Sequence, residues 1–154
     1  MSEQGGMASS KMEAIIEEFA DLDKRERLEL LLDFAESLPD LPARYQPQQN
    51  ADEHRVHECQ TPVFFWVEVN DGQVEIYAHV APEAPTVKGF VAILVDAFSG
   101  ESPKEVLAVQ PNLLGRLGLV EALGMVRMRG LNAILIRILQ EVRRAGATGS
   151  SNGQ

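Results

Sequence analysis

Residues 63–80 read VFFWVEVNDGQVEIYAHV, and they give the clearest indication of the architecture. Its first half is rich in β-branched and aromatic residues, which favour strands. In its second half, apolar residues alternate strictly with polar or aromatic ones, so they share one face of a strand. Between the halves, Asp71-Gly72 tolerates the positive φ angles of a tight turn. We therefore predict an antiparallel β-hairpin with one apolar face.

Helices are predicted before the hairpin. Ser10 with Glu13, and Asp23 with Glu26, each have the spacing of a capping box, which starts a helix. Apolar residues then recur at helical spacing, namely Ile15, Ile16, Phe19 and Leu22 in the first helix and Leu28, Leu31, Leu32, Ala35 and Leu38 in the second. A proline- and glutamine-rich segment, 39–53, follows as a loop that is too polar to belong to the core.

Further helices are predicted after the hairpin. Thr86–Phe98 is an apolar helical segment, and Ser102-Pro103-Lys104-Glu105 combines an N-cap, a first-turn proline and a capping glutamate. Another helix begins at Asn112 and carries several leucines. The last helix is predicted from about residue 129 to 145, where Gly146 ends it.

This order of elements, helices around a hairpin, is typical of an α+β fold rather than an alternating α/β fold. A hairpin alone is too small to be stable, so helices must cover one face. We expect residues 54–57 to add a short strand, giving a small three-stranded antiparallel sheet packed against helices. Residues 10–145 form one domain in this interpretation, with a disordered N-terminus at 1–9 and a flexible tail at 146–154.

Composition limits the function classes. The 154 residues are 45% hydrophobic and 24% charged, as in soluble globular proteins. No apolar run approaches the ~20 residues that cross a bilayer, and the acidic N-terminus is not typical of a signal or transit peptide. The net charge of −9 disfavours nucleic-acid binding, because phosphates attract cations. We expect a cytoplasmic protein with no membrane partner.

Cys59 is the only cysteine, and it stands between a polar segment and the apolar run 63–67. It has no internal disulfide partner, which indicates a reducing compartment and chemistry with another molecule. A cysteine hydrolase is disfavoured because no histidine lies in a recognisable triad setting. A phosphatase-type loop is disfavoured because no arginine follows the thiol closely.

Other interpretations of Cys59 stay open. As a carrier, its thiol attacks the sulfane sulfur of a partner persulfide, by the chemistry of thiol–disulfide exchange. As a metal ligand, it combines with His54, His57 and His79, a set whose atom types suit zinc. As a buried cysteine, it is an inert small hydrophobe.

Several motifs carry a resemblance to a known family. The segment Val56-His57-Glu58-Cys59-Gln60-Thr61-Pro62-Val63-Phe64 is similar to V-x-G-C-x-S-x-V-W, with glutamate in place of glycine before the cysteine. Residues 83–90 resemble an acidic segment running into V-K-G-L, residues 117–119 an L-x-L element, and residues 127–131 the pattern S-R-x-N-G-L. Over about residues 10–145, the chain resembles the SufE family of sulfur acceptors for cysteine desulfurases.

This resemblance implies a compact α+β fold like that of iron–sulfur scaffold proteins. It implies that Cys59 accepts sulfur from a desulfurase that uses pyridoxal phosphate, stimulates that enzyme, and passes the sulfur to an iron–sulfur scaffold. The pyridoxal phosphate belongs to the desulfurase, and we expect this chain to bind no cofactor of its own. We expect Arg127 to brace the Cys59 loop or the interface, because a guanidinium pairs with carboxylates and carbonyls. Lys88 and Gly89 are expected to serve packing of a helix on the sheet.

Overall fold

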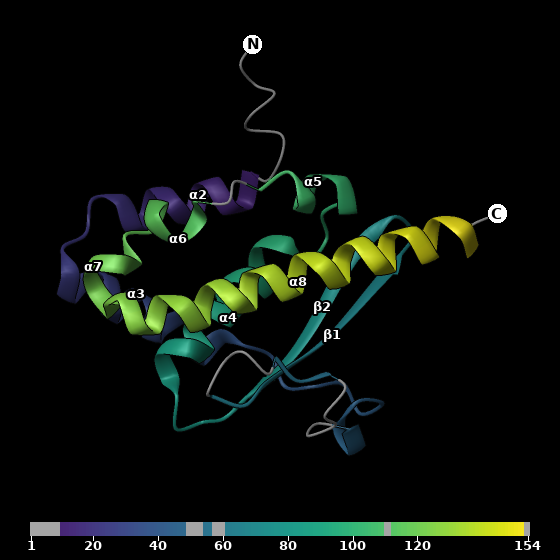
Figure 1. The fold of residues 1–154 in the computed structure, drawn as a ribbon, viewed down its shortest axis with the longest axis horizontal. Coiled ribbons are helices and arrows are strands. Elements are labelled where there is room, and N and C mark those ends of the chain that lie inside the picture. Colours follow the sequence, from purple (N-terminus) through teal and green to yellow (C-terminus); the bar gives the residue numbers. More distant parts are fainter. Residues whose placement is uncertain (1–9, 49–53, 57–60, 110–111, 153–154) are drawn as a thin grey trace, which may run out of the picture.

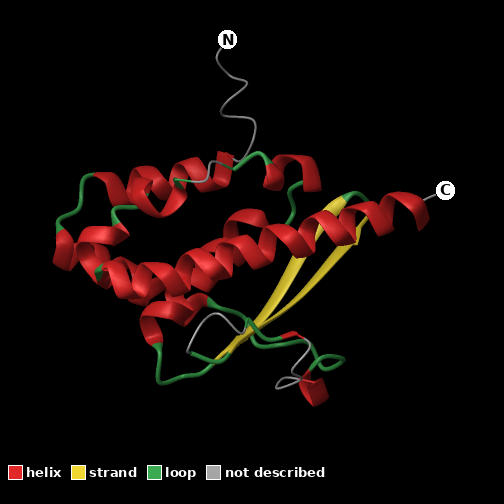
Figure 2. Ribbon diagram, in the orientation of Figure 1, coloured by secondary structure: helices red, strands yellow, loops and turns green. Residues whose placement is uncertain are grey.

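The structure is a computed structural model, and it describes residues 10–48, 54–56, 61–109 and 112–152 (Figure 1). Its elements in chain order are α2 (Ser10–Ala20), α3 (Lys24–Ser37), the 3-10 helix η1 (Gln46–Gln48), β1 (Val63–Asn70), β2 (Gln73–Val80), α4 (Pro85–Phe98), α5 (Pro103–Leu107), α6 (Leu113–Arg116), α7 (Leu119–Leu123) and α8 (Met125–Asn152). The α+β prediction is confirmed, since helices precede and follow one antiparallel hairpin (Figure 2).

The hairpin forms as predicted. β1 and β2 pair antiparallel from Val63 opposite Val80 to Asn70 opposite Gln73. Asp71 and Gly72 have φ angles of 55° and 78°, which are the left-handed values that a two-residue hairpin turn requires. Side chains of β2 alternate between the buried core and the opposite face. The helix α4 packs on the core side of β2, and α8 packs against β1.

The prediction of a third strand over residues 54–57 is wrong for the part that the structure describes. Among the described residues the sheet has two strands, and the segment before Cys59 adds only a single antiparallel bridge between Arg55 and Phe64. His54 lies in a helical turn, which is incompatible with a strand that extends through it. The rest of the predicted strand, His57, lies outside the described residues.

Capping explains where some helices begin. The Asp23 carboxylate accepts from the Glu26 backbone, and the Glu26 carboxylate accepts from the Asp23 backbone, both at 2.9 Å. Ser102 and Glu105 form the same reciprocal pair at 3.1 and 2.8 Å. These two predicted caps are therefore confirmed. The helix predicted from Asn112 is interrupted, because Gly118 takes a φ of 71° between α6 and α7.

The bounds predicted for the last helix are wrong at both ends. It begins at Met125, directly after Gly124, whose φ of 86° breaks the preceding helix. It continues through Gly146 to Asn152. A Cβ atom at Gly146 would lie 3.1 Å from the Cβ of Pro103, so this glycine permits close packing against α5 instead of ending the helix. No helix in the described part of the chain is long and apolar enough to cross a membrane.

The main core lies between the helices and the inner face of the hairpin. Its largest fully buried side chains include Phe19, Phe90, Phe98, Leu131 and Ile134. Gly89 serves a contact between helices, and not the helix–sheet contact that we expected. A Cβ atom there would lie only 2.2 Å from the carbonyl oxygen of Leu31, so α3 and α4 approach too closely for any side chain.

Candidate functional site: the two sides of the Cys59 segment

Cys59 lies outside the described residues, as do His57 and Glu58. The structure nevertheless describes the chain on both sides of this segment, at 54–56 and from Thr61 onward. The contacts of these two flanking segments define the described part of the candidate site.

The chain is fastened directly before and after the Cys59 segment. The backbone N–H of Val56 donates to the carbonyl of Val63 at 2.8 Å, and the Val56 side chain is fully buried. The carbonyl of Pro62 accepts from the N–H of Ala81 at 3.2 Å, which extends the hairpin ladder by one step. Backbone hydrogen bonds therefore fix the chain on both sides of the Cys59 segment, at Val56 and at Pro62–Val63.

Helix α8 supplies a further attachment. Arg137 donates through Nη1 to the carbonyl oxygen of Arg55 at 2.8 Å. Its Nε donates to Glu141 at 3.1 Å, one turn later on the same helix, so the guanidinium is held in place from both sides. This contact joins residues 82 positions apart, and it connects the segment before Cys59 to the long helix of the domain.

His54 ends a stack of aromatic rings on the outer face of the hairpin. Its ring centroid lies 4.9 Å from that of Trp66, and Nδ1 is 3.1 Å from the carbonyl oxygen of Phe65, within hydrogen-bond range. Tyr45 stacks on Trp66 at 5.3 Å and also contacts Tyr77 at 5.7 Å. The stack reaches from the entry to the Cys59 segment across the width of the sheet.

Residues 38–48, which we call the strap, cover this outer face. Leu41 of the strap forms a second small apolar cluster with Phe64 and Trp66 of β1, and Tyr45 and Tyr77 pack alongside. The strap was expected to be too polar for the core, but Leu41 is only 7% exposed. The polar side chains of Arg44 and Tyr45 lie at the surface of the cluster, where they form hydrogen bonds to Glu68.

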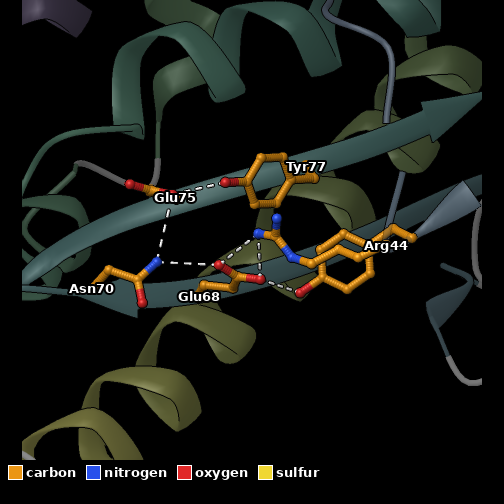
Figure 3. A network of polar contacts seen from close by, with 6 residues as sticks. Arg44, Glu68, Asn70, Glu75 and Tyr77 are labelled. Atoms are coloured by element: carbon orange, nitrogen blue, oxygen red, sulfur yellow. Dashed lines mark hydrogen bonds and ion pairs between the residues drawn. The ribbon is translucent and has the colours of Figure 1, made fainter. Parts of the chain in front are cut away.

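A polar network fastens the strap to both strands (Figure 3). Arg44 donates through Nη2 to the two carboxylate oxygens of Glu68 at 3.0 and 2.9 Å, and its guanidinium lies over the rings of Tyr45 and Tyr77. The Tyr45 hydroxyl also donates to Glu68. Tyr77 donates to Glu75 at 2.7 Å.

These contacts shift the pKa values of the network. Burial alone raises the pKa of Glu68, but hydrogen bonds from Tyr45, Arg44 and Asn70 outweigh it, and the pKa is lowered. Burial, together with the hydrogen bond to Glu68, raises the pKa of the Tyr45 hydroxyl. The hydrogen bond to Glu75 raises the pKa of Tyr77 in the same way, and burial adds to it. Near neutral pH, the network therefore holds an ionised Glu68 and neutral tyrosines.

Arg127 contacts another motif of the sequence. It is exposed near the start of α8, and its Nη1 donates to Oγ1 of Thr86 in the first turn of α4 at 2.6 Å. The two motifs at 83–90 and 127–131 are thus neighbours in the structure. The predicted bracing of the Cys59 loop stays a prediction, because that loop lies outside the described residues.

The metal alternative stays a prediction. Among the residues that it describes, no group of three or more His, Cys, Asp or Glu side chains is arranged to hold a metal ion. Two of the proposed ligands, His57 and Cys59, lie outside this part of the chain. His79 is opposite Phe64 in the ladder, and their rings are 6.0 Å apart. Elemental analysis of the purified protein tests for zinc or iron directly.

Comparison with known proteins identifies the family. Residues 13–142 match the family model SufE, described as an Fe-S metabolism associated domain. The chain belongs to the SufE family. An uncharacterised SufE-like protein of Mycobacterium tuberculosis is 35% identical over 132 residues, which are 85% of this chain and 90% of that protein. The cysteine desulfuration protein SufE of Plasmodium falciparum is 28% identical over 130 residues, 73% of this chain and 52% of that protein.

A solved structure has the same SufE-like fold. The solution structure of a hypothetical protein from Thermus thermophilus is 40% identical and superposes with a TM-score of 0.76. The match covers 89% of this chain and 96% of that one. The expected SufE-like architecture is therefore confirmed, apart from the third strand.

The sequence analysis did not predict the residues that fasten residues 54–56 and the strap to the rest of the SufE domain. Arg137 lies in the segment that was predicted only to be the last helix, and Arg44 and Tyr45 lie in the segment that was predicted to be a polar loop. Their partners Arg55 and Glu68 are distant in the sequence, so no local pattern marks them. Nε of Arg55 and Nε1 of Trp66 are also buried, and no described residue accepts a hydrogen bond from either.

Proposed function

We propose that this SufE family member accepts sulfur from a cysteine desulfurase and carries it as a persulfide on Cys59. The match to the family over residues 13–142, which include Cys59, carries the proposal. A relative named cysteine desulfuration protein SufE supports it. As the only cysteine of the chain, Cys59 is the one residue able to form a persulfide.

The transfer is a displacement at sulfur. The Cys59 thiolate attacks the terminal sulfur of a persulfide on the desulfurase cysteine. A new S–S bond forms on Cys59 as the S–S bond of the donor breaks, and the donor leaves as a thiolate. The proton lost by the Cys59 thiol balances the one that the donor thiolate takes up. The sulfane sulfur moves without net oxidation or reduction, so the step needs no further oxidant or reductant.

The described surroundings suit a carrier that must present a thiol to another protein. The bond between Val56 and Val63 and the contact of Arg137 with Arg55 hold the approach to Cys59 on the sheet and on α8. A reactive group is presented most reproducibly when rigid elements support the segment that bears it. Arg127, held by Thr86, is proposed to brace the same region or the partner interface.

The chemistry before and after this step belongs to the partners. The desulfurase supplies the pyridoxal phosphate that releases sulfur from cysteine. An iron–sulfur scaffold receives the sulfur from Cys59 and thereby regenerates the thiol. Removal of sulfur from the donor cysteine is the proposed means by which this chain stimulates the desulfurase.

Intact-mass measurement tests the proposal. The protein is incubated with a cysteine desulfurase and cysteine, and we expect a mass gain of one sulfur atom that a reductant reverses. Cys59→Ser, confirmed as folded by circular dichroism, is expected to gain none and to leave the desulfurase rate unstimulated. If a desulfurase that is active by itself adds no sulfur to the wild-type chain, the proposal is wrong.

A further inference from the structure

Two neighbouring residues at the start of α8 are the most exposed large apolar side chains in the described part of the chain. Met125 is 68% exposed and Val126 is 87% exposed, whereas Leu32 and Ile136 are 40% and 48% exposed. Single exposed apolar residues are normal on a protein surface. Here two of them are adjacent, and they occupy a first helical turn, where acidic residues would be favourable.

The two side chains stand on a rigid support. Gly124, with a φ of 86°, separates α7 from α8, and Met128 and Leu131 in the next turns of α8 are buried. The hydrogen bond from Arg127 to Thr86 fastens this end of α8 to the first turn of α4 (Figure 1). An apolar group that is already held in place loses little conformational freedom when a partner binds it.

Two arginines give the same surface a positive charge, although the chain has a net charge of −9. Arg129 follows Met125 by four residues and Val126 by three, so the three side chains share one face of α8. Arg127 and Arg129 are both exposed, and no described carboxylate lies within ion-pair distance of either. We call residues 125–127 and 129 the α8 corner.

The backbone adds to this positive charge. The first turns of α4 and α8 both lack an acidic residue, and no side chain caps the start of α4. The partial positive charge at each helix start is therefore not neutralised by a described carboxylate. The α8 corner thus combines exposed apolar side chains with unpaired positive charge, which suits a partner surface that is apolar and acidic.

The α8 corner is connected to the exit of the Cys59 segment. The carbonyl of Pro62 accepts from Ala81, and Ala81 precedes Thr86 by five residues, at most about 18 Å of chain. Arg127 contacts Thr86 at 2.6 Å. An interface of standard size, with about 800 Å² on each partner, is roughly 30 Å across. A protein that exchanges sulfur with Cys59 therefore has the α8 corner within reach of its interface.

We propose that the α8 corner is a docking surface for the cysteine desulfurase, with Met125 and Val126 in an apolar hollow of that enzyme bordered by aspartate or glutamate side chains. This proposal rests on the proposed function. Arg129 pairs with the bordering carboxylates, and the flexible Met125 side chain adapts to the shape of the hollow. Val126 stands where the pattern S-R-x-N-G-L has serine, so its contact helps to determine which desulfurases this chain accepts.

A second copy of this chain is a poorer occupant of the α8 corner. In a symmetric dimer the same surface of both copies meets, so the unpaired arginines of the two copies would oppose each other. Two side chains are also a small part of the area that a stable interface buries. The desulfurase supplies the remaining area, because sulfur transfer requires it to cover the surroundings of Cys59 as well.

Direct binding measurements test the proposal. The desulfurase of the intact-mass experiment is immobilised, and the whole chain is titrated by biolayer interferometry. Met125→Ser with Val126→Ser, the double variant, is expected to weaken binding about ten- to thirty-fold, the effect of removing apolar anchors from an interface. The matched control is Ile136→Ser, which changes an exposed residue of the same helix about 15 Å beyond Val126. We expect it to bind like wild type.

A second pair of variants tests the charge. Arg129→Glu is expected to weaken binding about three- to ten-fold, with a larger effect at low salt, because salt screens exposed charges. Arg143→Glu makes the same change of charge at an exposed arginine of α8, about 20 Å further along the helix. We expect it to change binding by less than about two-fold. Circular dichroism and thermal denaturation check that all variants are folded.

Sulfur acceptance separates the docking proposal from the proposed function. If wild type gains sulfur and the double variant binds as tightly as wild type, the docking proposal is wrong and the proposed function stands. If the double variant binds weakly and wild type gains no sulfur, the proposed function is wrong and the docking surface stands. Equal losses in Ile136→Ser, absence of binding by wild type, or a dimer of the free chain that the double variant dissociates overturns the docking proposal.

Discussion

Gly89 shows how a single residue determines the distance between two helices. The nearest atoms to a Cβ there, the carbonyl oxygen and Cγ of Leu31, would lie at 2.2 and 2.9 Å, far inside contact distance. One of these atoms belongs to the α3 backbone and does not rotate away. The glycine of the motif at residues 83–90 therefore has a packing explanation, and no chemical role is needed for it.

Gly89→Ala is expected to lower the free energy of unfolding by about 1–3 kcal/mol, the usual cost of forcing extra volume into a packed contact. Urea denaturation measures it. The matched control is Gly115→Ala in α6, where no atom lies within 4 Å of the added methyl group. We expect the control to be neutral or slightly stabilising, because alanine favours helix. Equal losses in both variants would show that the contact with Leu31 is not the cause.

At the scale of elements, the strap and the hairpin depend on each other. The strap covers Trp66, which is 3% exposed and is the only tryptophan of the chain. The carboxylate of Glu68 is the centre of the network that holds the strap, since Arg44, Tyr45 and Asn70 all donate to it. Because the same cluster includes the ring that stacks on His54, fastening the strap also supports the segment before Cys59.

Glu68→Gln is expected to lower the free energy of unfolding at pH 7 by about 0.5–1 kcal/mol, a small value because solvent screens this surface pair. The folded-state pKa of Glu68 is below the ordinary value of 4.5, so its contribution is complete above that pH. It is lost as the pH falls through the folded-state pKa. The stability difference between wild type and variant is therefore expected to vanish in acid, measured by Trp66 fluorescence during denaturation.

The comparison uses the difference in unfolding free energy between wild type and Glu68→Gln, because other groups titrate in the same pH range in both proteins. Burial raises the pKa of Glu101, and the nearby Glu105 adds to this, so its contribution has the opposite sign and favours the folded state as the pH falls. Glu29→Gln, which alters only an exposed pair with Arg25, serves as the control. A difference for Glu68→Gln that stays constant into acid would contradict this account of the network.

At the scale of the whole molecule, α8 is the element that the other parts share. It packs against β1 and against α4, α5, α6 and α7, and it crosses the length of the domain (Figure 1). Its buried face carries Leu131, Ile134, Leu135, Ile138 and Val142. The same helix holds Arg127 near its start and Arg137 further along, so it connects the core to the surroundings of the Cys59 segment.

Two isoleucines of α8 have the same side chain but very different exposure, so they test the effect of burial alone. Ile134 is 0% exposed and Ile136 is 48% exposed. Ile134→Ala is expected to cost about 2–5 kcal/mol of folding free energy, because it leaves a cavity among packed neighbours. Ile136→Ala is expected to stay within about 1 kcal/mol of wild type. Thermal and urea denaturation of both variants measure this, and similar losses would mean that α8 is not packed as described.

Local interactions explain what was predictable from the sequence. The hairpin follows from alternation in β2 and from the positive φ that Asp71 and Gly72 adopt, and the helix starts at Asp23 and Ser102 follow from capping. Each of these depends on residues within a few positions of one another. Cys59 was likewise singled out by its position in the sequence, and its role stays a proposal.

Features that depend on residues distant in the sequence became evident from the folded chain alone. Gly146 reads as the end of a helix, but Pro103 makes it a packing position inside α8. The strap was predicted to be a solvated loop, but Arg44 of the strap donates to Glu68, and Leu41 is buried against Trp66. The hairpin and the caps at Asp23 and Ser102 were predictable from the sequence, because short-range sterics and hydrogen bonds act within one segment. Helix ends, glycine roles and the fastening of residues 54–56 were decided by contacts whose free energy exists only once the chain is folded.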